Sequence, residues 1–243
     1  MAESARLEGQ VVLVVGAHGG LGSEAARAAA REGATVVLLG RRVPKLNQVY
    51  DQLVADGSPQ PAIYPLDLEG ASPADYEQLS DTLRREFGRL DGVLIAAAEC
   101  KGLSSIENSD PMDLVRAVHV NLTAPMLLLQ ALLPLQRENP SGSRIVLVLE
   151  DDSRVQHAFW GGYGVAKAGL GALLKILAEE LDGGAVKLTG MRPGPMRTNL
   201  RSRVFFAEDP GQWPAPAHYA GQCVAMLSGQ DATPHGQVWV AGA

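Results

Sequence analysis

The sequence predicts an α/β fold: a doubly wound parallel sheet of seven strands with helices on both faces. Short, wholly apolar runs alternate with segments of helical composition, which is typical of repeated β-α-β units whose parallel strands are buried. The composition of the 243 residues does not shift along the chain, and no linker, sequence repeat or low-complexity stretch interrupts it. We therefore expect a single domain, residues 1–243.

Each expected strand is a mostly apolar run, and most of these runs are followed by a stretch of helix-forming residues. The expected strands are 11–15, 35–39, 62–66, 90–95, 144–149, 185–191 and 237–240. The expected helices are 25–31, 44–55, 73–87, 111–137, 163–181 and 218–227. Ser72 and Pro73 are favourable residues for the cap and the first position of the third helix. Residues 201–216 show no clear period, which indicates a loop or short helices.

The composition is that of an ordinary globular protein, with 46% hydrophobic residues, 20% charged residues and a net charge of −6. The negative charge gives no indication of a nucleic-acid partner. Cys100 and Cys223 are far apart and favour a reduced, cytoplasmic protein. The first ten residues contain acids and lack the apolar run of a signal peptide. The longest apolar stretch, 125–135, is far below the roughly 20 residues of a membrane span, so we expect no membrane partner.

A glycine-rich turn follows the first expected strand and opens a helix, in the sequence Gly16-Ala17-His18-Gly19-Gly20-Leu21-Gly22. Glycines allow positive φ angles and let backbone N–H groups approach a phosphate, and the helix N-terminus adds partial positive charge. In this strand and helix context, the turn predicts a Rossmann-type dinucleotide site. His18 is either a contact to the adenine ribose side or a solvent-facing turn residue.

The end of the second expected strand indicates which dinucleotide is bound. An acidic residue there would bind the ribose 2′-hydroxyl of NAD. This chain has Arg41 and Arg42 instead, and two guanidinium groups suit a 2′-phosphate. The sequence therefore favours NADP(H) over NAD(H), although a solvated basic pair before a helix is the alternative.

Two motifs in the expected order resemble the short-chain dehydrogenase/reductase family. The first is the long glycine spacing through Gly16, Gly20 and Gly22, and the second is Y-x-x-x-K at Tyr163 and Lys167, after the fifth strand. Residues four apart share one side of a helix, and an ammonium near a phenol favours phenolate. Tyr163 is therefore a candidate general acid for carbonyl reduction or base for alcohol oxidation.

The resemblance implies further site residues. Asn121 matches a family asparagine that holds a water in the proton relay, and Asp67 matches a residue that binds the adenine amino group. Residues 192–198 resemble the P-G-x-x-x-T segment, which anchors the nicotinamide carboxamide through Met196 and Thr198. The cofactor contacts expected in all are Gly16, His18, Gly19, Gly20, Leu21, Gly22, Arg41, Arg42, Asp67, Leu68, Ala97, Tyr163, Lys167, Pro193, Gly194, Met196 and Thr198. Taken alone, Asp67 is equally a helix cap, Asn121 a core amide bonded to backbone, and Lys167 a solvated lysine.

Three segments are similar to the bacterial YciK-like branch of this family, namely 90–94, 130–135 and 159–163. That branch is poorly defined in its substrate. The resemblance therefore implies a small-molecule substrate and a homodimer or homotetramer, formed through helix 111–137 and the helix after Tyr163. It also implies a lid over the substrate cleft at about 199–216, where Phe205, Phe206 and Trp213 indicate an apolar pocket.

The chain departs from the family pattern at three places. Ala96-Ala97-Ala98-Glu99 stands where the family has N-N-A-G, and Val15 replaces a threonine or serine. Glu150 lies thirteen residues before Tyr163, at the place of the catalytic serine. An ionised Glu150 would repel the developing oxyanion, a protonated one could donate to it, and Ser153 could substitute if the loop shifts.

Three functional hypotheses follow. The first is an NADP-dependent oxidoreductase acting on a small carbonyl or alcohol, with Tyr163, Lys167, Asn121 and Glu150 at the catalytic centre. The second is a catalytically impaired nucleotide-binding or scaffold protein of the same fold, which Glu150 and Glu99 favour. The third is a changed reaction in which Glu150 is itself a working acid or base.

Overall fold

The computed structural model describes residues 5–242 and contains one seven-stranded sheet in that range, with strand order β3-β2-β1-β4-β5-β6-β7. Every neighbouring pair of strands is parallel. The strands are β1 Val11–Val15, β2 Thr35–Gly40, β3 Ala62–Pro65, β4 Gly92–Ile95, β5 Ser143–Val148, β6 Val186–Arg192 and β7 Val238–Val240. The predicted doubly wound parallel sheet is therefore confirmed.

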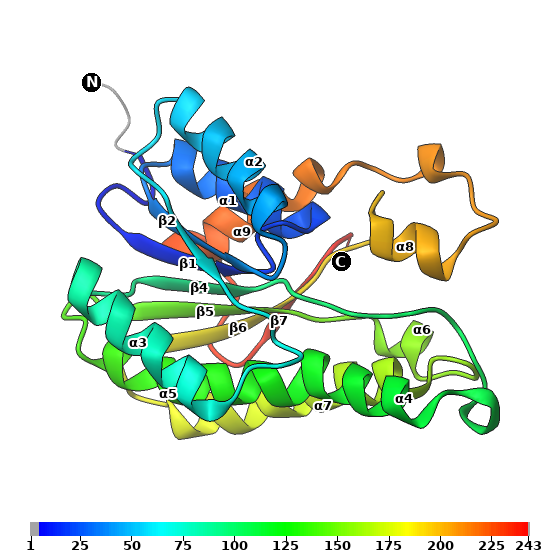
Figure 1. Ribbon diagram of the computed structural model, residues 1–243. Helices are drawn as coiled ribbons and strands as arrows, with labels where there is room; N and C mark the ends of the chain where they lie inside the picture. The colour runs from blue at the N-terminus through cyan, green and yellow to red at the C-terminus, as the bar shows by residue number, and fades with distance from the viewer. Residues whose placement is uncertain (1–4, 243) are drawn as a thin grey trace.

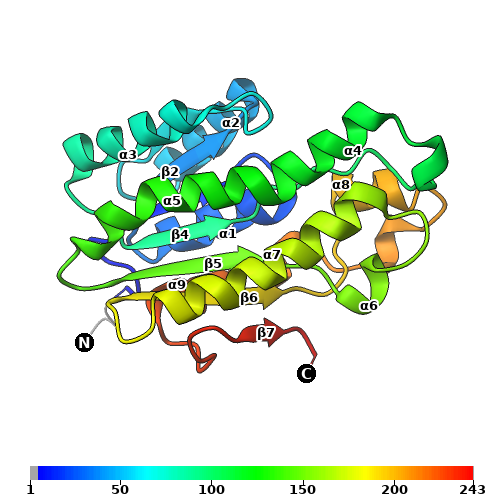
Figure 2. The same cartoon turned by 90° about the horizontal axis from the view of Figure 1, so that it is seen from below.

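Helices cover both faces of this sheet (Figure 1). One face carries α1 Gly20–Arg31, α2 Val43–Ala55 and α9 Ala220–Ser228. The other face carries α3 Pro73–Phe87, α4 Pro111–Val118, α5 Ala124–Arg137 and α7 Gly161–Glu180. Two short helices, α6 Asp152–Val155 and α8 Asn199–Val204, stand at the same end of the molecule in both views (Figures 1 and 2).

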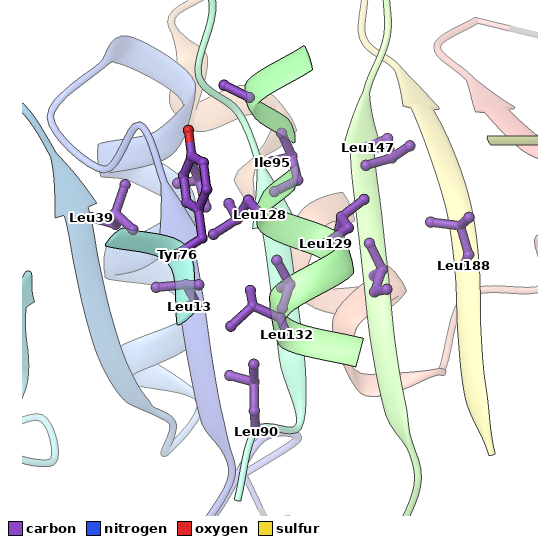
Figure 3. Close-up of a cluster of buried hydrophobic side chains, with 14 of the residues drawn as sticks. Leu13, Leu39, Tyr76, Leu90, Ile95, Leu128, Leu129, Leu132, Leu147 and Leu188 are labelled. Carbon is purple, nitrogen blue, oxygen red and sulfur yellow. The ribbon is translucent and has the colours of Figure 1, made fainter. Parts of the chain in front are cut away.

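The strands are readable in the sequence because the central ones are buried on both faces. All five residues of β1 are buried, so no polar position interrupts the run. On the face covered by α3, α5 and α7, strand leucines meet helix leucines in one cluster (Figure 3). The cluster shown there includes Leu13, Leu39, Tyr76, Leu90, Ile95, Leu128, Leu129, Leu132, Leu147 and Leu188.

Several element boundaries differ from the sequence expectation. Helix α1 begins at Gly20, earlier than the expected residue 25, because the glycine turn leads directly into the helix. The expected helix 111–137 is continuous, but its middle, His119–Thr123, is a π-helix between α4 and α5. Residues 201–216 contain the end of α8 and the 3₁₀ turn Pro210–Gln212, as an aperiodic segment of short helices should.

The helical segment Pro111–Arg137 is long and apolar enough, by length and composition alone, to cross a membrane. In the sequence, only the stretch 125–135 was considered, which Gln130 and Pro134 interrupt, and so the apolar length of this segment was underestimated. Its apolar side chains Leu128, Leu129 and Leu132 are fully buried against the sheet (Figure 3). The apolar character is therefore that of a core helix.

A buried aspartate holds together the amino-terminal ends of the strands. Asp91 is 4% exposed and accepts hydrogen bonds from the Val11 backbone N–H at 2.8 Å and from the Asn139 amide at 2.8 Å. Arg89 donates to both carboxylate oxygens of Asp91, at 2.8 and 2.6 Å. This single side chain thus links β1, the entry to β4 and the loop before β5.

Candidate active site

A cleft of about 290 Å³ opens at the carboxyl ends of the strands. Ligands of open α/β sheets bind at this edge. Every residue predicted to contact the cofactor lines the cleft except Gly22, which supports the turn from behind. Of the predicted catalytic residues, Glu150, Tyr163 and Lys167 line it and Asn121 does not.

The glycine turn has the backbone geometry of a phosphate site. Gly16 has φ +86°, and its N–H and that of Ala17 donate to the Leu39 carbonyl at 2.9 and 3.1 Å. Gly19 caps α1 with an extended backbone and no side-chain hydrogen bond. The first N–H groups of α1 therefore have no side-chain acceptor and are available to an anion.

Replacing Gly22 by alanine is expected to weaken dinucleotide binding at least tenfold. A Cβ at residue 22 would collide with the Gly16 carbonyl oxygen, so the turn must shift. Titration of NADPH by calorimetry measures the loss, and Gly171→Ala on α7, where a Cβ meets nothing within 4 Å, is the matched control. Unchanged affinity in Gly22→Ala would contradict the phosphate-binding role of the turn.

A basic corner lies at the ends of β2 and β3. It is formed by Arg41, Arg42 and Lys45, and His18 and Asp67 line the same part of the cleft. Within residues 5–242, neither Arg42 nor Lys45 forms an ion pair with a carboxylate of the chain. Lys45 was not identified from the sequence as a cleft residue. Its position three residues after Arg42, at the start of α2, could have indicated that it joins the two arginines.

Glu99 connects this corner with helix α8 through ion pairs. One carboxylate oxygen pairs with Arg41 at 2.9 Å and the other with Arg203 of α8 at 3.1 Å. Arg203 also donates to the Cys100 carbonyl at 3.1 Å, and Glu69 lies 3.7 Å from Arg41. The negative charge that the sequence places near the cofactor is therefore neutralised by two guanidinium groups.

Asn121 positions the backbone of Glu99. Its Oδ1 accepts from the Glu99 N–H at 3.0 Å, and its Nδ2 donates to the carbonyls of Glu99 and Ala117, each at 2.8 Å. The side chain is 1% exposed. It has the backbone-bonded core position that the sequence left open as an alternative, and its part in a proton relay stays a prediction.

Tyr163 faces Glu150 in this structure. Its hydroxyl donates to Glu150 Oε1 at 2.8 Å, while the other carboxylate oxygen pairs with Arg154, four residues along. Burial raises the pKa of the Tyr163 phenol well above its ordinary value, and the Glu150 charge adds to the rise. The phenol is therefore held protonated.

Lys167 is buried beneath Tyr163. Its Nζ donates to the Val148 carbonyl at 3.3 Å and lies 5.8 Å from the centroid of the phenol ring. Burial lowers the pKa of Lys167. Burial and Glu150 set the direction of the phenol pKa here, and the expected lowering by Lys167 stays a prediction. The alternative of a solvated lysine is wrong, because Lys167 is 4% exposed.

Ser153 does not replace the missing serine. Its hydroxyl donates to Asp151 Oδ1 at 2.7 Å, at the exposed start of α6. The cleft wall beside Tyr163 is formed instead by Arg154 and Trp160, two residues that sequence reasoning missed. Spacing could have suggested Arg154, since a residue four positions after Glu150 pairs with it once α6 forms.

The segment 199–216 contains an arginine stacked between two aromatic rings. Arg201 lies 4.5 Å from the ring centroids of both Phe205 and Trp213 and pairs with Glu208 at 2.7 Å. Phe205 lines the cleft, as expected. Phe206 is 90% exposed, and Trp213 is occupied by Arg201 and Glu208, so neither contributes to an apolar pocket.

The comparisons with known proteins agree with this geometry. Residues 10–209 match the model of the short chain dehydrogenase family. The chain belongs to the short-chain dehydrogenase family. It is 34% identical to the uncharacterized oxidoreductase YciK of Escherichia coli K12, over 87% of this chain and 83% of that protein. The predicted resemblance to the YciK-like branch is thereby confirmed.

Solved structures of other short-chain dehydrogenases superpose over nearly the full chain. A short chain dehydrogenase from Pseudomonas syringae is 37% identical, with a TM-score of 0.90 and coverage of 98% of this chain and 97% of its own. One from Escherichia coli CFT073, complexed with NADPH, is 32% identical, with a TM-score of 0.93 and coverage of 99% and 100%.

Proposed function

We propose that this short-chain dehydrogenase binds NADP(H) and moves a hydride between the nicotinamide and a small carbonyl or alcohol. The observation that carries the proposal is the continuity of the cleft, which runs from the basic corner past the glycine turn to the Tyr163 hydroxyl. The NADPH bound by the Escherichia coli CFT073 relative supports the cofactor assignment.

The residues of the cleft fit a phosphorylated dinucleotide. The N–H groups of the glycine turn would hold the pyrophosphate, and Arg42 and Lys45 carry the charge that a 2′-phosphate needs. Met196 and Thr198 also line the cleft and would hold the nicotinamide end. NADP(H) would supply the hydride.

Tyr163 would exchange the proton at its Oη. Because the phenol is protonated at rest, it is poised to donate to a carbonyl oxygen, which favours reduction. Donation requires Tyr163 to leave Glu150, whose carboxylate accepts the same hydrogen in the unliganded site. Lys167 is the buried cation closest to the phenol ring and would stabilise the phenolate left behind.

A second candidate function rests on that same contact. Glu150 holds the Tyr163 hydroxyl and presents a carboxylate where a substrate oxyanion would develop. A protein that binds NADP(H) without turning it over, as a nucleotide sensor or scaffold, is consistent with this arrangement. Tight NADPH binding without oxidation across a broad panel of carbonyl compounds would favour it.

Cofactor preference is the first experiment. We expect NADPH to raise the melting temperature and bind more tightly than NADH. Arg42→Ala is expected to weaken NADPH about 10-fold or more, since one charge-assisted hydrogen bond contributes roughly 1.5–3 kcal/mol, and to leave NADH unchanged. Arg85→Ala, an exposed arginine on α3, is the control. Equal affinities for the two cofactors would contradict the assignment.

The proposal extends to the organisation of the protein. We propose a single domain, a lid at about 199–216, a cytoplasmic location and a homodimer or homotetramer. Exposed apolar side chains on α4 and α7, namely Met112, Val115, Val165 and Ile176, support an interface between copies. Size-exclusion chromatography with light scattering measures the assembly.

A further inference from the structure

The ring of His18 lies between the glycine turn and the end of β2. It lies inside the glycine turn, and its Nδ1 is buried without a hydrogen-bond partner within residues 5–242. The ring packs against the end of β2, where a Cβ on Gly40 would collide with Nδ1. A buried polar atom without a partner is costly, so contacts within the described chain do not explain the position of this ring.

The charged groups around the ring come from three elements. Arg41 and Arg42 follow β2, Lys45 belongs to α2, and Asp67 follows β3. Burial and then the three cations hold the pKa of His18 below its ordinary value, with Asp67 opposing them. His18 is therefore neutral when the corner is empty.

A phosphate dianion would reverse this balance. Placed among Arg41, Arg42 and Lys45, it would cancel the positive field that disfavours imidazolium and would attract a proton to the ring. The ring lies against Gly40, the residue before Arg41, and lines the same cleft as the three cations, so a charge bound by them also acts on the ring. A 5′-phosphate at the glycine turn belongs to both dinucleotides, whereas a 2′-phosphate distinguishes them.

We propose that His18 is a specificity-determining residue, which takes up a proton when a 2′-phosphate binds at the corner of Arg41, Arg42 and Lys45. The inference rests on the proposed NADP(H) function and adds that nucleotide binding is coupled to proton uptake. The proposal implies that the pKa of His18 is higher in the complex than in the free protein. At any pH between these two pKa values, the complex therefore holds more protons than the free protein. Affinity for the phosphorylated nucleotide therefore falls as the pH rises through that window, and affinity for the unphosphorylated one does not.

Calorimetry with two fragments tests the linkage without any substrate. Adenosine 2′,5′-bisphosphate and 5′-AMP are titrated at about pH 7 in buffers of different ionisation enthalpy, which gives the protons taken up per site. We expect a substantial fraction of a proton for the bisphosphate and almost none for 5′-AMP. The phosphate's own second pKa, near 6, would release protons on binding to cations, so uptake has the opposite sign and cannot come from the phosphate.

Variants assign the proton to His18. In the unaltered protein, affinity for the bisphosphate should fall about three- to tenfold per pH unit. His18→Gln keeps a polar side chain that does not titrate, so it should abolish both the proton uptake and this fall in affinity. His157→Gln, an exposed histidine outside the cleft, should retain both. In the unaltered protein, the imidazole nitrogen NMR shifts of His18 should move to the imidazolium pattern when the bisphosphate is added.

The outcomes separate this inference from the proposed function. Bisphosphate binding without proton uptake, uptake that persists in His18→Gln, or a His18 ring that stays neutral in the complex would overturn the role of His18 and leave NADP(H) binding intact. If neither NADPH nor the bisphosphate binds, the proposed function is wrong and the inference falls with it.

Discussion

Replacing Glu150 by serine is expected to raise the rate of NADPH oxidation with small aldehydes and ketones by about 100-fold or more. In the present site, the Glu150 carboxylate accepts the Tyr163 hydrogen at 2.8 Å and would face the oxyanion of the transition state. A serine hydroxyl removes that charge and donates a hydrogen bond. Loss of a single oxyanion donor costs about a hundred- to a thousandfold in rate, so its introduction is expected to have an effect of that size. Stopped-flow or steady-state loss of NADPH absorbance measures it.

The same variant has a second readout that needs no substrate. Because the Glu150 charge raises the pKa of Tyr163, Glu150→Ser and Glu150→Gln should both let the phenol ionise at lower pH. Tyrosinate absorbance against pH reports this, with Tyr163→Phe identifying the band. Glu180→Ser, an exposed position at the far end of α7, is the control. If Glu150→Ser binds NADPH but shows no turnover and no shift in the phenol titration, Glu150 does not control Tyr163.

Replacing Asp91 by alanine is expected to lower the free energy of unfolding by about 3–5 kcal/mol. The Asp91 carboxylate accepts hydrogen bonds from the Val11 N–H, the Asn139 amide and the Arg89 guanidinium, and the change removes all of them. The residue is only 4% exposed. These donors are left at the amino-terminal ends of the strands without a partner. Urea denaturation followed by circular dichroism measures the loss.

A control variant and a binding measurement show whether the loss of stability is specific to Asp91. Asp51→Ala, an exposed aspartate on α2, should change stability by less than about 0.5 kcal/mol. NADPH affinity should be retained in Asp91→Ala under native conditions, because Asp91 lies at the end of the sheet opposite the cleft. A loss below about 1 kcal/mol would mean that water satisfies the orphaned donors.

The fold was predictable because its determinants are local. A buried parallel strand needs an uninterrupted apolar run, and β1 and β2 supply such runs between glycines and helix-forming segments. The glycine turn was predictable for the same reason, since the spacing of its glycines within residues 16–22 can be read directly from the sequence. The π-helix in the long helical segment was not, because no periodic signal distinguishes His119–Thr123 from the α-helix on either side.

Many residues of the cleft were predictable, but Lys45, Arg154 and Trp160 were missed, and the contacts could not be predicted. The pairing of Glu99 with Arg203 joins residues that are 104 positions apart, and only the folded segment 199–216 brings them together. The Glu150 side chain faces Tyr163 because α6 places Arg154 on its other oxygen. A motif at fixed spacing identifies Tyr163 and Lys167, but the protonation of the phenol depends on how deeply the fold buries it.

The Glu99 carboxylate, which pairs with both Arg41 and Arg203, has a consequence for redesign of the nucleotide preference. Exchanging Arg41 for an acidic residue is a direct way to disfavour a 2′-phosphate, but it also deprives Glu99 of the partner at 2.9 Å. Glu99 would then face a like charge on one side and keep only Arg203 on the other. An exchange at residue 41 would therefore be transmitted to α8, so a successful design must alter residues 41, 99 and 203 together.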